Sequence, residues 1–496
     1  MTVARITLGA LRGATGVSQF RGIPYATAER FRPPIAITAW AGARDARRHG
    51  PIAPQPPAGY FRTRNLEMAA QDENCLTLSI ATPAVPPPAE LTTAADEFAP
   101  RPVVVFIHGG GYETGAGSLE LYDPATLCAD SDVVVVRINY RLGALGFLYL
   151  PGVAECNMGL LDIIAALRWL QTHITQFGGD PANITLIGHE AGAHAILCLL
   201  TMWDSQGLFH RIFLASCPIG ITPQSREIAR QTANQLCDAA GVNPSDLADL
   251  STVQIIGAQN KVCHNLRRFA EITMPFMPMF DTLHGYNDPT LFLQAAAQPA
   301  AARGIRMIIG TTREEMHANL AASNTLLPPS SVAIATRFAE ITGSADTITL
   351  YRHRRAGGNN CDLLGDLMTD HLFLFPALAL AEATTNAGGQ AWVYQFDWSP
   401  RGSELRACQG IDLACLFGTA AAWTETKILD GAQPGEYQSI GNAQRAALGE
   451  FVHTDDPAAP GLPWPPYRLP MRLTMRFDTA LGPSGDPAGA NWRMAE

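Results

Sequence analysis

Lysine is almost missing from this chain: Lys261 and Lys427 are its only two lysines. Lysine and arginine together number 35 against 45 acidic residues, which gives a net charge of −10. This net charge gives no reason to expect a nucleic-acid partner, since nucleic acid requires a basic face. Arginine in place of lysine, with abundant alanine, glycine and proline, is typical of a GC-rich genome and indicates a bacterial source.

Long apolar runs are also missing. The longest, "PVVVFI" and "VVVV", have the length of strands and fall short of the ~18–20 residues that a membrane helix needs. The first residues, "MTVARITLGALRG", have no apolar core like that of a signal peptide. We therefore expect a soluble, cytoplasmic protein with no membrane partner.

The ten cysteines show no C-x-x-C spacing, which argues against a zinc or redox site. In a reducing compartment disulfides are not expected either. The glycine-rich "HGGG" is not followed by the GK[ST] of a phosphate loop. The sequence thus predicts neither a metal nor a cofactor.

Continuous valine and isoleucine runs are what the chain does contain, and they alternate with amphipathic helical patterns. This alternation predicts a large, mostly parallel, doubly wound α/β sheet whose strands are covered on both faces. Residues 227–370 are helix-rich and are expected to cap the sheet, and the proline-rich segment 81–102 is expected to be an exposed loop. No linker divides the chain, so we predict a single domain over residues 1–496. The expected strands are 75–81, 103–110, 132–141, 306–311 and 391–398, with a further strand within 177–188, and the expected helices are 157–179 and 191–203.

The segment "ITLIGHEAGAHA", residues 184–195, reads as a strand, a sharp Gly-x-x-x-Gly turn and a helix. Such a turn normally presents a serine nucleophile, but here Glu190 stands at its tip. His189 and His194 are five residues apart, one more than in the H-E-x-x-H motif, so they do not share a helical face and a zinc protease is rejected.

Ordered motifs along nearly the whole chain resemble the type B carboxylesterases, the cholinesterase-like branch of the α/β-hydrolase fold. They are "FRGIPYA", "DENCLTLSI", "IHGGGYETG", "VRINYRLGALGFL", the stretch from 157 to 188, "GLFHRIFLAS", "GTTREE" and "CQGIDLACLFG". The resemblance implies an α/β-hydrolase fold with helical cap insertions. By itself a fold does not give the function.

In that family a serine, a histidine and a carboxylate act together on an ester. Matching the motifs places Glu190 at the serine position, Gln409 at the histidine position and Glu315 at the acid position. The resemblance also implies oxyanion donors, the backbone N–H groups of Gly110, Gly111 and Ala191. Two triad members are thus replaced while the surrounding cradle is retained.

Three further residues are expected to support this site without reacting. The resemblance places Ser216 behind it. His189 is expected in the same supporting role. His194 could pair with Glu190 four residues earlier, although packing behind the turn is the interpretation that we favour over pairing.

Gln409 has no basic nitrogen and Glu190 has no hydroxyl, so ordinary ester hydrolysis is not expected. Two arrangements of Glu190 are open. Its carboxylate either fills the oxyanion hole or points into the pocket, where Gln409 would bridge it to Glu315. Two carboxylates in one buried site push their pKa values apart, which suits acid–base work. A covalent carboxylate nucleophile is disfavoured because no histidine would activate water.

The leading hypothesis is a non-hydrolytic acid–base enzyme of the cyclase, lyase or isomerase type, with a role in natural-product biosynthesis. The methionines and phenylalanines of "MPFMPMFD", Met274 to Asp281, favour an apolar small-molecule substrate. The alternatives are a catalytically inactive binding homologue and an ester hydrolase with atypical machinery.

Overall fold

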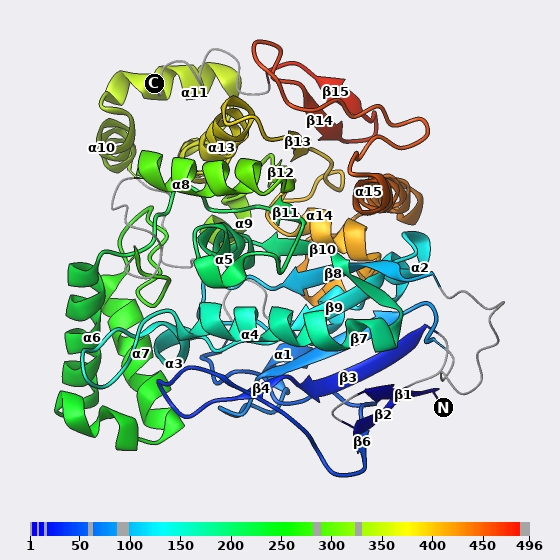
Figure 1. Ribbon diagram of the computed structural model, residues 1–496. Helices are drawn as coiled ribbons and strands as arrows, with labels where there is room; N and C mark the ends of the chain where they lie inside the picture. The colour runs from blue at the N-terminus through cyan, green and yellow to red at the C-terminus, as the bar shows by residue number, and fades with distance from the viewer. Residues whose placement is uncertain are drawn as a thin grey trace.

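The structure is a computed structural model that describes residues 2–6, 9–13, 17–57, 63–86, 99–280, 289–322 and 330–486. Its main element is a sheet of ten strands in the order β15-β14-β13-β12-β11-β10-β8-β9-β7-β3 (Figure 1). All pairs from β9 to β14 are parallel, whereas β3, β7 and β15 pair antiparallel at the two edges. The ten strands are β3 Ser18–Pro24, β7 Thr77–Thr82, β8 Arg101–Ile107, β9 Val134–Ile138, β10 Gly179–His189, β11 Arg211–Ala215, β12 Arg306–Thr312, β13 Ala391–Phe396, β14 Thr474–Phe477 and β15 Gly482–Ser484.

Both faces of this sheet are buried, as β8 shows. Val103, Val105 and Ile107 belong to one hydrophobic core, while Val104 and Phe106 belong to a second core on the other face. Successive side chains of a strand point to opposite faces, so a strand covered on both sides must be apolar throughout. The continuous valine runs therefore follow from helices on both faces.

The helices form two layers around the sheet. One core contains apolar residues of α4, α5, α8 and α13, and the other contains those of α2, α14 and α15. Figure 1 shows α4 and α5 in front of the central strands. The helices are α1 Arg64–Glu67, α2 Ala125–Asp130, α3 Gly143–Phe147, α4 Met158–His173, α5 Ala191–Leu200, α6 Arg226–Ala240, α7 Thr252–Leu266, α8 Pro289–Ala302, α9 His317–Ala322, α10 Ser331–Thr342, α11 Ile348–Arg354, α12 Asn360–Thr369, α13 Phe375–Asn386, α14 Ile411–Phe417 and α15 Pro434–Thr454.

Two small sheets accompany the main one, β1-β2-β6 and β4-β5. Their strands are β1 Thr2–Ile6, β2 Gly9–Gly13, β6 Ala43–Asp45, β4 Ala26–Thr27 and β5 Ile35–Ala36. The predicted cap is present as α6 and α7, which pack on the first core, and as α10 to α12, which form a separate apolar cluster. In Figure 1 the pair α6 and α7 stands at one side of the sheet.

One helical stretch in the described part of the chain, Asn360–Asn386, is long and apolar enough to cross a bilayer. It combines α12, a π-helical turn at Asp370–Leu374, and α13. Its most apolar window is 78% buried inside the molecule. Its apolar composition is therefore explained by packing in the interior of the protein.

The predicted strands and helices are present, with shifted ends. The helix expected over 157–179 ends at His173 and is followed by the 3-10 turn Ile174–Phe177. Strand β7 extends to Thr82 and β8 begins at Arg101, so the expected loop is shorter at both ends, and its residues 87–98 lie outside the described residues. Its exposure there stays a prediction, as does the single domain.

Candidate active site

Glu190 stands at the turn between β10 and α5, at the carboxyl edge of the sheet. Its backbone angles, φ 50° and ψ −116°, are sparsely populated for a residue with a side chain. Its N–H donates to Ala215 O at 3.0 Å, which ties the turn to β11. The turn is tight: a Cβ at Gly192 would lie 2.1 Å from Ile107 O, so only glycine lets α5 approach β8 this closely.

The Glu190 side chain fills the cradle formed by the loop after β8. The N–H groups of Gly110 and Gly111 both donate to Glu190 Oε2, at 2.7 and 2.8 Å. Gly110 has φ 114°, and a Cβ there would lie 2.2 Å from Thr114 O, so this donor needs a glycine. The third expected donor, the N–H of Ala191, does not take part: the Glu190 side chain accepts no hydrogen bond from the N–H groups of the first turn of α5. Of the two arrangements that the sequence left open, the structure has the filled cradle.

Apolar side chains lie beside this cradle. Glu190 itself is partly exposed. A Cβ at Gly111 would lie 3.9 Å from Met274 Cγ, so the predicted methionine-rich segment borders the donors. Phe276 and Met277 are buried in the first core, and Asp281 lies outside the described residues.

His194 does not pair with the Glu190 carboxylate. Its Nε2 lies 2.9 Å from Ile221 O and its Nδ1 lies 2.8 Å from the Tyr112 hydroxyl. A carbonyl oxygen only accepts, so Nε2 carries the proton and Nδ1 accepts from Tyr112. Burial lowers the pKa of His194 to about 4. The favoured interpretation, a histidine packed behind the turn, matches this geometry.

His108 and His189, which also lie at this edge, are buried as well. His108 stacks on Tyr140 with ring centroids 4.6 Å apart, and Tyr140 donates to His108 O at 3.0 Å. Burial lowers the pKa of His108 to about 4 and that of His189 to about 3. At neutral pH neither ring supplies a positive charge near Glu190.

Glu315 follows β12 and is fully buried. The backbone N–H of Thr312 donates to its Oε1 at 2.7 Å. Burial raises the pKa of Glu315 to about 8, and the negative charge of Asp412 contributes to the rise. At neutral pH this carboxyl group is therefore mostly protonated, unlike an ordinary glutamate.

Gln409 is held next to Glu315 by backbone pairing. Glu314 and Cys408 form a parallel bridge, so the two following residues leave neighbouring backbones. Gln409 is buried, and its Nε2 has no hydrogen-bond partner. The predicted bridge through Gln409 between Glu190 and Glu315 is therefore wrong. The Glu190 carboxylate accepts from the cradle and Glu315 accepts from the Thr312 N–H, and neither contacts the Gln409 amide nitrogen.

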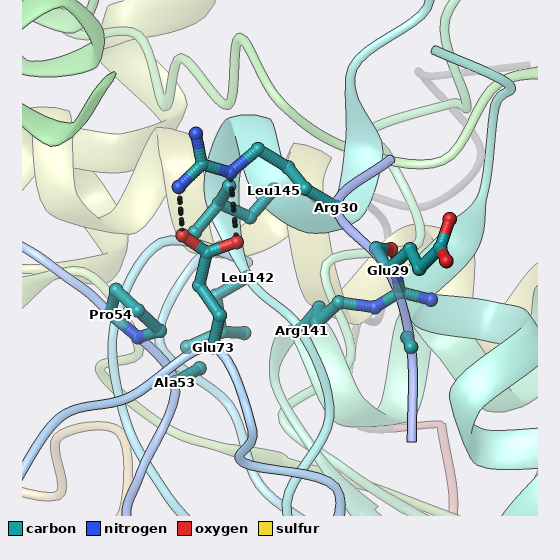
Figure 2. Close-up of a pocket in the computed structure, with 9 residues that line it drawn as sticks. Glu29, Arg30, Ala53, Pro54, Glu73, Arg141, Leu142 and Leu145 are labelled. Carbon is teal, nitrogen blue, oxygen red and sulfur yellow. Dashed lines mark hydrogen bonds and ion pairs between the residues drawn. The ribbon is translucent and has the colours of Figure 1, made fainter. Parts of the chain in front are cut away.

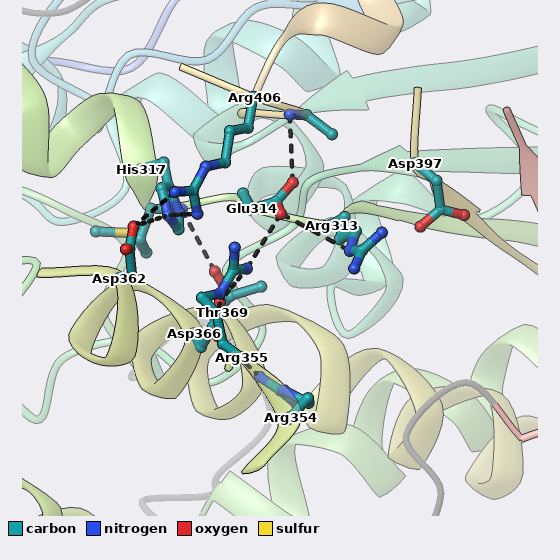
Figure 3. Close-up of polar contacts among 12 residues, drawn as sticks. Arg313, Glu314, His317, Arg354, Arg355, Asp362, Asp366, Thr369, Asp397 and Arg406 are labelled. Carbon is teal, nitrogen blue, oxygen red and sulfur yellow. Dashed lines mark hydrogen bonds and ion pairs between the residues drawn. The ribbon is translucent and has the colours of Figure 1, made fainter. Parts of the chain in front are cut away.

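An ion network holds the segments that carry these two residues (Figure 3). Glu314 Oε1 accepts from Arg355 at 3.1 Å, and its Oε2 accepts from the Ala407 N–H at 3.3 Å. Arg406 pairs with Asp362 at 3.0 Å on α12. The network thus fixes the loop after β12 to the segment before α14.

Sequence reasoning missed four residues that shape this edge. Cys263 of α7 donates its thiol to Glu113 Oε1 at 2.9 Å, and burial raises the pKa of Glu113. Tyr394 donates to Asp412 Oδ2 at 2.8 Å, and burial raises the pKa of Asp412 to about 6. Asp412 lies within the quoted motif "CQGIDLACLFG" and Glu113 within "IHGGGYETG", so their charges were usable signals, whereas no quoted motif contains Cys263 or Tyr394.

A small enclosed cavity of about 10 Å³ lies elsewhere, beside the ion pair of Arg30 and Glu73 (Figure 2). Arg141 and Leu145 also line it, whereas Glu190 and the residues of its cradle do not. This volume suits one water molecule, so the cavity is no substrate site.

Comparison with known proteins decides the family. The model of the carboxylesterase family matches residues 2–482. The chain belongs to the carboxylesterase family. It is 32% identical over 488 residues to a protein named "Probable N-octanoylanthranilate hydrolase" from Rhodococcus erythropolis, covering 96% of this chain and 98% of that protein. It is 30% identical to the para-nitrobenzyl esterase of Bacillus subtilis over 97% of this chain and 95% of that enzyme.

The solved carboxylesterase of Geobacillus stearothermophilus superimposes over the full length of both chains, with a TM-score of 0.84 and 29% identity. The sheet order and this match establish the α/β-hydrolase fold that the sequence predicted. Within the described residues no group of three or more metal-ligating side chains could hold a metal ion. Membership of the carboxylesterase family suggests an enzyme, and the chemistry at Glu190 is the question that remains.

Proposed function

We propose that this member of the carboxylesterase family is a non-hydrolytic acid–base enzyme of the cyclase, lyase or isomerase type, which acts on an apolar small molecule. In this proposal Glu190 and Gln409 replace the serine and histidine of the catalytic triad. The observation that carries it is the pair of hydrogen bonds from Gly110 and Gly111 to Glu190 Oε2. An ester carbonyl needs those same donors, and here a carboxylate occupies them.

The acid–base role is supported by how the two carboxyl groups differ. Glu190 is partly exposed, accepts two backbone N–H bonds, and forms no ion pair among the described residues. Glu315 is fully buried, and burial raises its pKa to about 8. One group is thus placed to accept a proton while the other holds one at neutral pH.

A general-base probe tests this role without knowledge of the substrate. The ring of 5-nitrobenzisoxazole opens when a base removes its carbon-bound proton, and the product is a coloured phenolate. We expect elimination at least about a hundredfold faster than with acetate, lost in Glu190→Gln, which keeps the length but not the basicity. If Glu190→Gln eliminates as fast as the wild type, the acid–base role is wrong.

Ester hydrolysis, the activity named for the relatives, is tested with para-nitrophenyl butyrate. We expect no turnover above background in the wild type, and none in Glu190→Ser, because Gln409 still has no basic nitrogen. Turnover by the wild type that ends in Glu190→Gln would make the protein an atypical ester hydrolase instead.

A second candidate is a binding homologue without catalysis. It is favoured by the unpartnered Gln409 Nε2 and by His194, which is committed to Tyr112 and Ile221. Tight binding of an apolar ligand with no elimination of the benzisoxazole would support this candidate over the first.

A further inference from the structure

Tyr112 has a backbone conformation that residues with a side chain disfavour. It follows the two glycines of the cradle, and the three consecutive residues Gly110, Gly111 and Tyr112 have φ angles of 114°, 63° and 61°. Glycine adopts such positive angles freely, whereas a Cβ makes them unfavourable. A strained residue beside a functional site points to a role for its side chain.

His194 is unusual for its helix. All residues of α5, "AGAHAILCLL", are buried, and His194 is the only ionisable one besides Cys198. A polar ring in such surroundings is unfavourable unless its polar atoms have partners. Both ring nitrogens have one: Nε2–H donates to Ile221 O at 2.9 Å, and Nδ1 accepts from the Tyr112 hydroxyl at 2.8 Å.

Both side chains keep the protonation state that their hydrogen bond requires. Burial lowers the pKa of His194 to about 4, so at neutral pH its Nδ1 has a free lone pair. Burial raises the pKa of Tyr112, which therefore keeps the proton that it donates. Cys198 Sγ lies 3.9 Å from the same nitrogen, but a thiol is a weak donor. The Tyr112 hydroxyl is thus the main partner of Nδ1.

This hydrogen bond closes a ring of contacts around Glu190. The backbone N–H of His194 donates to Glu190 O at 2.9 Å. The ring of His194 accepts from Tyr112, and Tyr112 directly follows Gly111, whose N–H donates to Glu190 Oε2 at 2.8 Å. His194 therefore contacts the backbone of Glu190 directly and, through Tyr112, the loop that holds its carboxylate.

Both ends of the Tyr112–His194 bond are anchored. The Tyr112 ring meets Phe147 of α3 edge-on with ring centroids 4.8 Å apart, and Tyr112 O accepts from the Gly143 N–H at 2.7 Å. His194 is anchored to Ile221, in the segment that follows β11. One hydrogen bond thus links the loop after β8 to α5 and to a third segment, so the position of the cradle relative to α5 depends on it.

We propose that Tyr112 and His194 are positioning residues, whose hydrogen bond sets the Gly111 N–H against Glu190 and so orients the carboxylate toward the substrate. Both cradle bonds end on Oε2, which leaves Oε1 to accept the proton of a substrate C–H bond. A misplaced base slows proton transfer more than it weakens substrate binding. The inference rests on the acid–base function proposed above and assigns the residues that orient its base.

The benzisoxazole elimination tests the pair through its separate effects on kcat and KM. The C–H bond breaks and its proton goes to Oε1, while its electron pair completes a nitrile and the N–O bond breaks to release the phenolate. We expect Tyr112→Phe, which removes only the hydroxyl, to lower kcat about tenfold with KM within about twofold. The matched control is Tyr25→Phe, at a similarly buried tyrosine that donates to Asn139 O at 2.7 Å, and it should keep the wild-type kcat.

His194 allows a rescue that a merely structural role would not predict. In His194→Gln the amide oxygen replaces Nδ1 as acceptor and the amide nitrogen replaces Nε2 as donor, so most of the rate should remain. His194→Leu loses both bonds and should be as slow as Tyr112→Phe. The double variant should be no slower than either, because the same bond is lost. A His194→Gln variant as slow as His194→Leu would overturn the proposal.

Infrared difference spectroscopy gives an arm that needs no turnover. Each protein is measured against the same protein carrying Glu190→Gln, which isolates the antisymmetric stretch of the Glu190 carboxylate. Tyr112→Phe should shift this band, because the hydrogen bonds to the carboxylate change, and Tyr25→Phe should not. Tyr112→Phe keeps the ring that packs on Phe147, so this comparison holds even if His194→Leu does not fold.

Failure of the positioning role is distinguishable from failure of the proposed function. If the band shifts in Tyr112→Phe but the wild type shows no base activity, the pair still positions Glu190 and the acid–base function falls. If the wild type shows base activity but Tyr112→Phe matches Tyr25→Phe in both kcat and band position, the function stands and the positioning role falls.

Discussion

Glu190 combines a strained backbone with a fixed side chain. Its φ of 50° lies in a region that glycine adopts freely and other residues avoid. Such a conformation costs about 1–3 kcal/mol and persists only where the surrounding structure holds it. Here α5, β11 and the glycine loop all hold the turn.

This strain predicts an order of stability for two variants. Glu190→Gly and Glu190→Ala both lose the two cradle hydrogen bonds, but only glycine relieves the backbone. After the entropy that glycine gains in the unfolded chain, we expect Glu190→Gly to be more stable than Glu190→Ala by about 1 kcal/mol. Urea unfolding measures the difference, and a more stable alanine variant would contradict the strain.

Glu315 predicts a pH dependence of stability. Its folded pKa of about 8 lies above the ordinary 4.5, so between these values the folded state binds the proton more tightly than the unfolded state. The stability that Glu315 contributes is present at acidic pH and is lost as the pH rises from about 5 to 8, at up to about 1.4 kcal/mol per pH unit.

The measurement compares unfolding free energies of the wild type and Glu315→Gln across this range. The difference between them should shrink steadily with rising pH, since glutamine does not titrate. Glu404→Gln, at an exposed glutamate, serves as the control and should follow the wild type. A difference that does not change with pH would show that Glu315 is ionised throughout.

At the scale of single residues, the sequence predicted which side chains matter but not all of their contacts. The motifs placed Glu190, Glu315 and Gln409 at one edge. Both arrangements of Glu190 were compatible with the sequence, because rotamer choice depends on distances across β8, β10 and β12. The unpartnered amide of Gln409 could not be foreseen for the same reason.

At the scale of elements, α7 is fastened to the body of the molecule by Arg30. Arg30 forms an ion pair with Glu73 and donates to the backbone oxygens of Ala248 and Leu250, just before α7 begins. Thr252, the first residue of α7, donates to the same Glu73 at 2.6 Å. Figure 2 shows the bidentate contact, in which two nitrogens of Arg30 each bind one carboxylate oxygen of Glu73.

We expect Arg30→Leu to loosen α7 selectively. Loss of a partly buried arginine leaves Glu73 and two carbonyl groups short of a donor, a cost of about 2 kcal/mol. Hydrogen exchange should become more than about tenfold faster in α7 but stay unchanged in β10. Arg47→Leu removes an arginine that pairs with Asp45 and is 51% exposed, and should leave both unchanged. Equal effects of the two variants would contradict a fastening role.

At this scale, the sequence located mainly the strands that form long continuous apolar runs. Strands such as β8 and β9 were located because burial on both faces requires continuous apolar runs. The edge strands β14 and β15 were missed, since "TMRF" and "GPS" carry no such run. Strand β3 and the fully buried strand β11, "RIFLA", were not among the expected strands either, so a short apolar run did not always indicate a strand. The edge of the sheet is held by pairing with its neighbour rather than by its own composition.

At the scale of the whole molecule, the stretch Asn360–Asn386 is apolar enough for a membrane helix but lies in the interior of the protein. It is 78% buried in its most apolar window, so it could meet lipid only if the core around it opened. We therefore expect the native protein to stay unbound in a flotation assay with phosphatidylcholine vesicles. Floating protein that keeps its native circular dichroism would contradict this expectation.

The parallel sheet brings the residues of the candidate site together. Parallel strands end at one edge, so residues that follow β8, β10, β11 and β12 meet there although long stretches of chain separate them. The order of motifs was enough to predict this meeting. It could not predict that the cradle is filled, because that depends on one side chain and two backbone donors.

The filled cradle has a consequence for reagents. Ester hydrolysis releases a carboxylate, and Glu190 places one, covalently attached, against the Gly110 and Gly111 donors. The protein thus contains a tethered analogue of a hydrolysis product, present at an effective concentration that free acids do not reach. Fluorophosphonates and boronic acids, which need both a nucleophile and an empty hole, should leave the peptide containing Glu190 unlabelled in mass spectrometry. Inhibitor panels made for its esterase relatives would then pass over this protein entirely.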